Sequence, residues 1–330
     1  MPSACAIPSY AHPEIDYGLL TGLLFCPDDG ARLSCSRTSI ECPACTRKFA
    51  ICEDGVVDLV PLRQREIAGT RNALYWNQYT KEFKKPYVPN PKAIAWGAPE
   101  TVDSGWVLKR MRQVRAVRPL VADSQFSKSQ WFCDVAAGAG NYTISYAPAF
   151  RGVLHCDLSV DNLSYAARRA KRLGARNIFF LRIDYFSPPF SNSLDRVICL
   201  DTLVRGEEHE IALLQSIQAA LKPDGRAVVD FHHWWHNPLR RVGLLQQNFV
   251  GNRSYSRKEA ASLLRRTGLP EFEYFPFHQE FNAGGRGEKL LSLIVPATRL
   301  LYRFPGMAAK ETALTVDREA TIEEFHVARL

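Results

Sequence analysis

An apolar run that ends in a turn of small residues constrains the fold of this chain more than any other feature. Residues 131–140 read WFCDVAAGAG, an order that predicts a buried strand followed by a tight turn. Glycine tolerates positive φ and lets a ligand approach the backbone closely. The segment therefore predicts the first strand of a doubly wound α/β sheet, whose ligands bind at the carboxyl ends of its strands. An ordinary strand-to-helix turn is the alternative, because Ala136 takes the place of the first glycine.

Carboxylates end the next three predicted strands as well. The apolar runs that follow close on Asp157, Asp184 and Asp201. A fifth run, 226–231, comes after a Leu-Lys-Pro-Asp-Gly turn. Asp157 lies roughly 20 residues past the first turn, where an acidic residue accepts hydrogen bonds from a ribose. Four acids at one rim of a sheet repel one another, which favours a polar, partly cationic ligand there.

Five motifs follow one another along this part of the chain: DVAAGAG, HCDLS, RIDYFSPPF, LDRVICLDTL and LKPDGRAVV. In order and spacing they resemble the class I S-adenosylmethionine-dependent methyltransferases, over roughly residues 125–300. Two positions depart from the family pattern: Ala136 replaces a glycine, and the turn at 221–225 has Pro-Asp-Gly in place of Pro-Gly-Gly. A nicotinamide-dependent enzyme is the competing interpretation, but Asp184 and the turn at 221–225 favour the methyltransferase.

The resemblance implies a Rossmann-like fold, with a seven-stranded, mostly parallel sheet between flanking helices, and S-adenosylmethionine as the cofactor. In this family a helix before the first strand often folds over the cofactor, so Tyr75 or Tyr79 could cover it. Packing of these rings against the core is the alternative. The resemblance places cofactor contacts on that helix and at the carboxyl ends of the first four strands: Tyr79, Asp134, Ala136, Gly138, Gly140, Asp157, Leu158, Asp184, Tyr185, Leu200 and Asp201.

A second pattern lies near the N-terminus. Cys42 and Cys45 form a Cys-x-x-Cys knuckle, whose two thiolates can hold one side of a tetrahedral zinc ion. Cys26 lies where a second knuckle is expected, but Asp29 stands in place of its partner cysteine. The stretch resembles the small zinc-ribbon modules that precede some methyltransferase domains, including certain rRNA guanine methyltransferases, and it also resembles tRNA-methyltransferase activator proteins.

Four residues could close a zinc site in this module: Cys26, Asp29, Cys42 and Cys45. Carboxylate is an acceptable zinc ligand, and Cys35 or Cys52 could replace the aspartate. A ribbon that keeps its fold by apolar packing, without metal, is the alternative. A unit of about 45 residues rarely folds unaided, so we expect either a metal or docking against the main domain.

A histidine-rich segment follows the fifth predicted strand. Residues 231–238 read FHHWWHNP, and in this fold the loop after the fifth strand borders the substrate cavity. Methyl transfer requires that the acceptor be positioned and that its proton be accepted. Histidine titrates near neutral pH, so His232 or His233 is the predicted base; a purely structural role in the loop is the alternative. His209 is predicted to be a surface residue, with a position facing the pocket as the alternative.

Three functions remain compatible with these patterns. Methyl transfer to a small-molecule acceptor, a metabolite or natural product, is favoured. The alternative is methylation of an rRNA or tRNA base, with the ribbon and the basic helix 109–118 holding the RNA; a non-catalytic cofactor-binding partner protein is the third. The net charge of +8 permits a nucleic-acid partner, but a solvated basic surface is the commoner reason for such a charge.

The composition is that of a globular chain. Its 330 residues are 46% hydrophobic and 23% charged, and no apolar run reaches the roughly 18 residues of a membrane span. The N-terminus lacks a signal-peptide pattern, so the nine cysteines suggest reduced thiols or a metal and a cytoplasmic location. The sequence does not indicate an oligomeric state.

We divide the chain into four parts by composition and motif. Residues 1–62 are a lead and the zinc-ribbon-like module, and 63–124 a helical bridge or lid. Residues 125–304 are the S-adenosylmethionine-binding domain, whose last two strands are predicted at 272–277 and 289–295. A capping box at 256–259 predicts a helix before those strands. Residues 305–330 are predicted to be a polar helical tail.

Overall fold

The structure, a computed structural model, describes residues 15–65, 114, 117–122, 127–203, 206–232, 255–277 and 310–315. Several predictions fall outside these residues: Tyr79 with its lid helix, most of the basic helix 109–118, His233 and the strand at 289–295. The backbone of His232 is described as the end of a strand.

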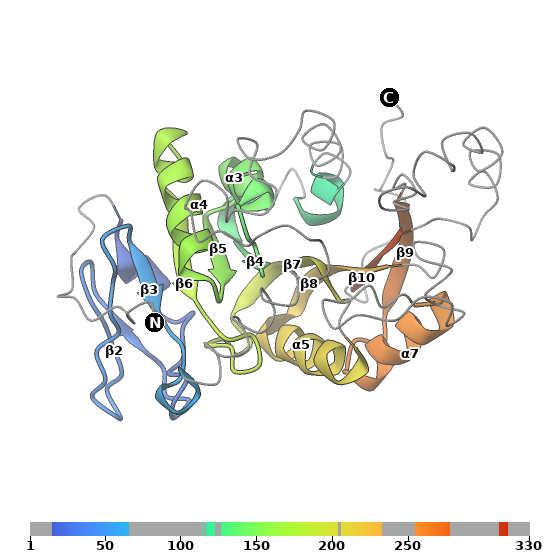
Figure 1. Cartoon of the computed structure of the whole chain (residues 1–330), viewed down its shortest axis with the longest axis horizontal. Helices are drawn as coiled ribbons and strands as arrows, with labels where there is room; N and C mark the ends of the chain where they lie inside the picture. Colours follow the sequence, from blue (N-terminus) through green and yellow to red (C-terminus); the bar gives the residue numbers. More distant parts are fainter. Residues whose placement is uncertain are drawn as a thin grey trace, which may run out of the picture.

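The centre of the molecule is a mostly parallel sheet (Figure 1). Its strands are β3 (Val56–Asp58), β4 (Trp131–Val135), β5 (Gly152–Asp157), β6 (Ile178–Arg182), β7 (Leu194–Leu203), β8 (Leu221–His232), β9 (Phe272–Phe277) and β10 (Lys310–Thr315). Their order in space is β3-β6-β5-β4-β7-β8-β10-β9, and only β10 runs antiparallel to its neighbours, β8 and β9. The chain leaves β4 first toward β5 and later toward β7, so β4 lies at the topological switch point where ligands of such sheets bind.

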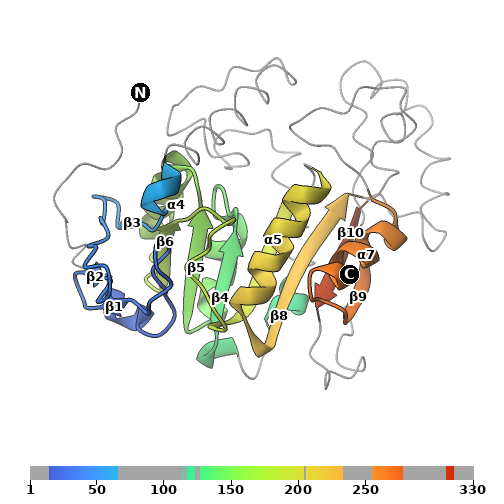
Figure 2. The same cartoon turned by 90° about the horizontal axis from the view of Figure 1, so that it is seen from below.

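Helices cover both faces of this sheet, and Figure 2 shows α4 and α5 lying along its strands. The helices are α3 (Asn141–Tyr146), α4 (Val160–Arg172), α5 (Glu207–Ala220) and α7 (Arg257–Arg266), with short 3-10 turns η1 (Tyr17–Leu20), η2 (Leu62–Gln64), η3 (Ser127–Ser129) and η4 (Ala147–Ala149). Residues of α3 and α4 pack into one apolar cluster, and residues of α5 and α7 into another on the opposite face. Strands covered on both faces read as continuous apolar runs, which is why β4 is buried along its whole length.

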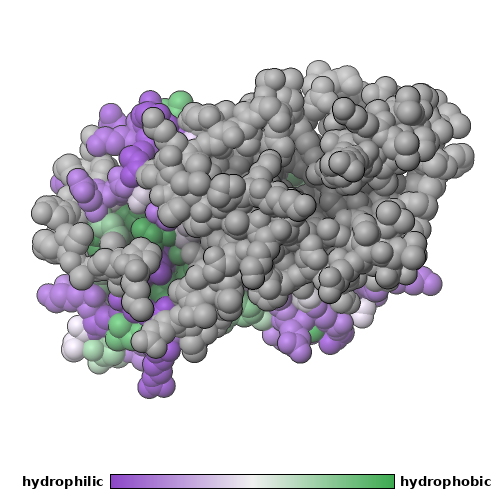
Figure 3. Space-filling model, in the orientation of Figure 1, coloured by the Kyte–Doolittle hydropathy of each residue, from purple (hydrophilic) through white to green (hydrophobic). Residues whose placement is uncertain are grey.

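The helices begin where the sequence places capping residues. Ser159 is the N-cap of α4 and accepts the Asn162 N–H. Ser256 opens α7 with a complete capping box to Glu259, which confirms the prediction for that helix. On α4 the apolar side faces the sheet, while Arg168, Lys171 and Arg172 are exposed; Figure 3 shows hydrophilic surface at this end of the molecule.

The N-terminal module, residues 15–65, contributes a strand to the central sheet. Its β1 (Ser34–Cys35) and β2 (Ile40–Glu41) form a small antiparallel hairpin, and its β3 pairs in parallel with β6 (Figure 1). Apolar side chains of the module belong to the same buried cluster as Trp131 and Phe179 of the sheet. The expected seven-stranded sheet is therefore present and is extended by an eighth strand, β3, at one edge.

The C-terminal part differs from the prediction. Residues 305–330 were expected to be a helical tail, but Lys310–Thr315 form β10, inserted between β8 and β9. The segment KETALT has few apolar residues, so hydrophobicity did not mark it as a strand. Its residues pair with a strand on each side, and such pairing leaves little trace in hydrophobicity.

Among the residues that the structure describes, no helix is long and apolar enough to cross a membrane.

Candidate functional site

The turn after β4 has the backbone that a ligand-binding loop requires. Ala136, Gly138 and Gly140 all have positive φ, at 57°, 54° and 73°. A Cβ at Gly138 would meet no atom within 4 Å, so this backbone borders open space. A Cβ at Gly140 would lie 3.3 Å from Ala166 Cβ and from the His155 ring. Gly138 thus leaves room for a ligand, whereas Gly140 allows helix and strand to pack closely.

Asp134 holds the start of α3, the helix that follows this turn. Its Oδ2 accepts hydrogen bonds from the Thr143 N–H at 3.1 Å and the Thr143 hydroxyl at 2.6 Å. The same hydroxyl oxygen lies 2.8 Å from His155 Nδ1. A hydroxyl has one proton to donate, so His155 donates from Nδ1 to Thr143. Burial lowers the pKa of His155 to about 3, and this neutral tautomer helps to tie the start of α3 to β4 and β5.

Asp157 lies beside the glycine turn, at the carboxyl end of β5. Its Oδ2 accepts the Gly138 N–H at 2.9 Å, and its Oδ1 accepts the Ser159 N–H at 2.8 Å. Burial raises the pKa of this carboxyl group. The Asn162 side chain and the Leu158 backbone interact with the same carboxyl group. The bonds to Gly138 and Ser159 connect two loops that the sequence separates and hold the carboxylate beside the glycine turn.

The other predicted cofactor residues lie along the same edge, which we call the cofactor edge: the carboxyl ends of β4, β5, β6 and β7. Asp184 is buried, and its Oδ1 accepts the Phe186 N–H at 3.1 Å. Tyr185 and Leu200 are half-buried beyond β6 and within β7. Asp201 is described by its backbone alone, as part of β7. Leu158 follows Asp157 and is half-buried. Their roles as cofactor contacts stay predictions.

His209 is a residue of this region that sequence reasoning misplaced. It was expected on the surface, but its side chain is 12% exposed. Its Nε2 lies 2.5 Å from the Tyr185 hydroxyl, and its ring packs against Phe186. His209 lies in the first turn of α5, which directly follows β7. This position at the carboxyl end of a parallel strand is the signal that could have placed it near the cofactor edge.

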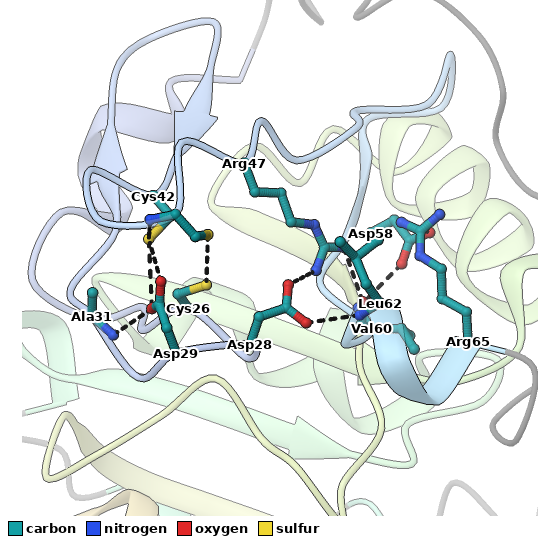
Figure 4. A network of polar contacts seen from close by, with 11 residues as sticks. Cys26, Asp28, Asp29, Ala31, Cys42, Arg47, Asp58, Val60, Leu62 and Arg65 are labelled. Carbon is teal, nitrogen blue, oxygen red and sulfur yellow. Dashed lines mark hydrogen bonds and ion pairs between the residues drawn. The ribbon is translucent and has the colours of Figure 1, made fainter.

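A compact group of ligand atoms lies in the N-terminal module (Figure 4). We call it the metal-ligand cluster: Cys26, Asp29, Cys42 and Cys45, whose ligand atoms all lie within 4.8 Å of one another. The Cys26 and Cys45 sulfurs are 3.8 Å apart, and Cys42 Sγ is 3.2 Å from Asp29 Oδ2. The Cys45 N–H points at Cys42 Sγ at 3.4 Å. Sequence reasoning named these four residues, and the structure brings them together without Cys35 or Cys52.

The spacing of the cluster suits a tetrahedral metal ion. Two thiolates bound to zinc at about 2.3 Å lie about 3.8 Å apart, which is the separation of Cys26 and Cys45. Hydrogen bonds from the Ala31 N–H and the Cys42 thiol lower the pKa of Asp29 to about 2, so this ligand is anionic. Burial raises the pKa of the Cys26 thiol to about 12. Metal binding there would release its proton, because thiolates are the metal-binding form.

Replacing Ala136 by glycine tests the strain in the glycine turn. A non-glycine residue in the left-handed region costs about 1–2 kcal/mol, and the greater freedom of glycine in the unfolded chain offsets part of this. We expect A136G to raise the free energy of unfolding in urea by about 0.5–1 kcal/mol. The matched control is A139G, because Ala139 is buried and lacks a positive φ; it should destabilise the protein. A lower stability for A136G would contradict the assigned backbone strain.

The central part of the chain is similar to known proteins. Residues 132–225 match the family described as a methyltransferase domain. A demethylmenaquinone methyltransferase of Renibacterium salmoninarum is 34% identical over 135 residues, which cover 40% of this chain and 54% of that protein. The chain thus spans about half of the length of this curated relative.

Solved structures of methyltransferases resemble the chain more distantly. Phosphoethanolamine N-methyltransferase 2 of Haemonchus contortus, in complex with S-adenosyl-L-methionine, is 17% identical with a TM-score of 0.49, covering 74% of this chain and 60% of that chain. Magnesium protoporphyrin IX methyltransferase of Synechocystis is 16% identical with a TM-score of 0.49. The match covers 77% of this chain and 98% of that chain. Residues 132–225 thus resemble a methyltransferase domain, and the strand order of the sheet is that of a Rossmann-like fold.

Proposed function

We propose that this protein is an S-adenosylmethionine-dependent methyltransferase that acts on a small-molecule acceptor. One observation carries the proposal: the open backbone of Gly138 and the carboxylate of Asp157 lie next to each other and are hydrogen-bonded, at the switch point of the sheet. An open main chain suits the close approach of a ligand, and the carboxylate suits ribose hydroxyls. The match of residues 132–225 to a methyltransferase domain supports the same cofactor.

S-adenosylmethionine supplies an electrophilic methyl group on a sulfonium. The chain has to hold this cofactor, place the acceptor in line with the methyl group and accept a proton. Asp157 would bind the ribose, and Asp184 and Tyr185 would border the base, as the motif order implies. Proton acceptance falls to His232, the last residue of β8, or to His233, which follows it.

A small-molecule acceptor is favoured over RNA. By its name, the curated relative with 34% identity acts on demethylmenaquinone, which supports an apolar, aromatic type of acceptor. Salt dependence separates the two alternatives, because RNA binding weakens steeply with salt, whereas turnover of a small molecule does not.

Cofactor binding is the first test. Titration calorimetry of the purified protein with S-adenosylmethionine should show saturable binding. We expect D157A to weaken it by about 1–3 kcal/mol, the cost of leaving buried polar partners unpaired. The matched control is D161N, since Asp161 is exposed in the first turn of α4, and it should bind as the wild type does. Equal affinity of D157A and wild type would contradict the role of Asp157, and no binding by a folded, cofactor-free wild type would contradict the function.

The base is tested by turnover. With an acceptor found among small aromatic metabolites, we expect H232A or H233A to lower kcat by about 100-fold or more, because a positioned base contributes that much. The affinity for S-adenosylmethionine should stay unchanged, since neither residue is assigned to the cofactor. If both variants turn over at the wild-type rate, the proton acceptor lies elsewhere.

We propose further that the metal-ligand cluster binds one zinc ion, with Asp29 as the fourth ligand. The support is the mutual distance of the four ligand atoms and their thiolate and carboxylate chemistry. Such a site would stabilise a module whose strands, β1 and β2, are only two residues long, because a structural zinc contributes directly to folding.

Elemental analysis tests the zinc site. We expect about one zinc per chain in the wild type and a loss of zinc in C42S, because a tetrahedral site needs four ligands. The matched control is C35S, since Cys35 lies outside the cluster, and it should retain the metal. D29C would complete four thiolates and should hold zinc against a stronger chelator. A zinc-free wild type whose melting temperature does not respond to added zinc would indicate a ribbon without metal.

A further inference from the structure

Three charged residues lie side by side on neighbouring strands at the cofactor edge. In the sheet register, Asp58 of β3 is opposite Arg182 of β6, and Arg182 is opposite Asp157 of β5. Backbone bonds continue this register past the strand ends: the Leu59 N–H donates to the Arg182 carbonyl at 2.9 Å, and the Ile183 N–H donates to the Asp157 carbonyl at 3.1 Å. The row therefore joins the N-terminal module to the loop that carries the predicted ribose acceptor.

The Arg182 guanidinium contacts groups on both sides of its strand, in β3 and in the loop after β5. Its Nη1 lies 3.1 Å from Asp58 Oδ2, and its Nε donates to the Leu158 carbonyl at 3.3 Å. Leu158 stands between Asp157 and Ser159, the N-cap of α4. The rigid fork of a guanidinium can serve two acceptors in one plane, which the point charge of a lysine cannot do as well.

Asp58 holds the guanidinium in place. It is 1% exposed, and its Oδ1 accepts the Val60 N–H at 3.2 Å. Arg65 Nη2 lies 3.2 Å from Oδ2, the oxygen that also contacts Arg182. A buried carboxylate that is paired with two cations and a backbone donor is fixed in orientation.

The row is connected to the metal-ligand cluster through the module (Figure 4). Asp28, next to the ligand Asp29, accepts bonds from Arg47 and from the Leu62 N–H. Arg47 Nη2 donates to the Val60 carbonyl at 2.9 Å. The Val60 N–H in turn donates to Asp58 Oδ1. Asp28, the end of β3 and Arg182 thus belong to one polar network, which is joined to the cluster through the backbone between Asp28 and Asp29.

We infer that Arg182 is a positioning residue for the cofactor: held by Asp58 of the N-terminal module, it fixes the Leu158 carbonyl and so orients the Asp157 carboxylate toward the ribose. The inference rests on the proposed cofactor site. Asp157 accepts hydrogen bonds from the Gly138 and Ser159 N–H groups, and the Ser159 N–H belongs to the same peptide group as the Leu158 carbonyl. A shift of this peptide would therefore move one of the donors to Asp157. Arg182 acts through that peptide and is not itself assigned to the cofactor.

The experiment combines cofactor affinity with hydrogen exchange in the full-length protein. We expect R182M and R182K to weaken S-adenosylmethionine binding by about 2- to 30-fold, the range for residues that act through a neighbour. R182K keeps the charge opposite Asp58 and so keeps the module docked if R182M fails to fold. In both variants the amides of residues 157–163 should exchange faster in the absence of cofactor. D58N should shift both readouts in the same direction.

The matched control is R168M. Arg168 also bridges to the module, through Asp54 at 2.6 Å. This pair is partly exposed, and within the described part of the chain no hydrogen bond or ion pair links it to the cofactor edge. R168M should bind the cofactor and exchange as the wild type does. Wild-type affinity and wild-type exchange in R182K would overturn the inference. If the wild type binds no S-adenosylmethionine, the proposed function fails, while faster exchange of 157–163 in R182K would still support the positioning of this loop.

Discussion

The parallel pairing of β4 with β5 on one side and β7 on the other determines most of what this molecule can do. This pairing places the ends of three strands at one edge, and the backbone there has to turn sharply into helices. The sharp turn after β4 puts Ala136, Gly138 and Gly140 at positive φ. Because the strands are covered by helices on both faces, the ends of the strands are where main-chain groups and carboxylates can meet a ligand.

The parts of the fold that depend on local pattern could be predicted from the sequence. Five apolar runs became β4 to β8, and the capping box at Ser256 opened α7 as expected. The four metal-ligand residues were found from two short motifs, Cys26-x-x-Asp29 and Cys42-x-x-Cys45, at the separation along the chain that a zinc ribbon requires. Each of these signals is a short motif in the sequence, so one sequence is sufficient to recognise it.

The parts that depend on distant pairing could not be predicted. Nothing in Val56–Asp58 indicates that this three-residue strand pairs with β6. The same is true of β10, whose neighbours in space are β8 and β9. His209 was misplaced for a related reason: its partner Tyr185 comes from a different strand end. Sequence spacing shows which residues share an element, but it does not show which elements become neighbours.

The position of β3 has a consequence for the order of events in folding. Asp58 and Arg182 are 124 positions apart, and the module shares its buried cluster with Trp131 and Phe179. During synthesis the module emerges before the strands of the sheet from β4 onward, and its contacts with the sheet form only after β6 has been made. Contacts between distant positions slow folding. The module therefore lacks its native surroundings until β6 has been synthesised, and the sheet is complete only once β10 has been added between β8 and β9.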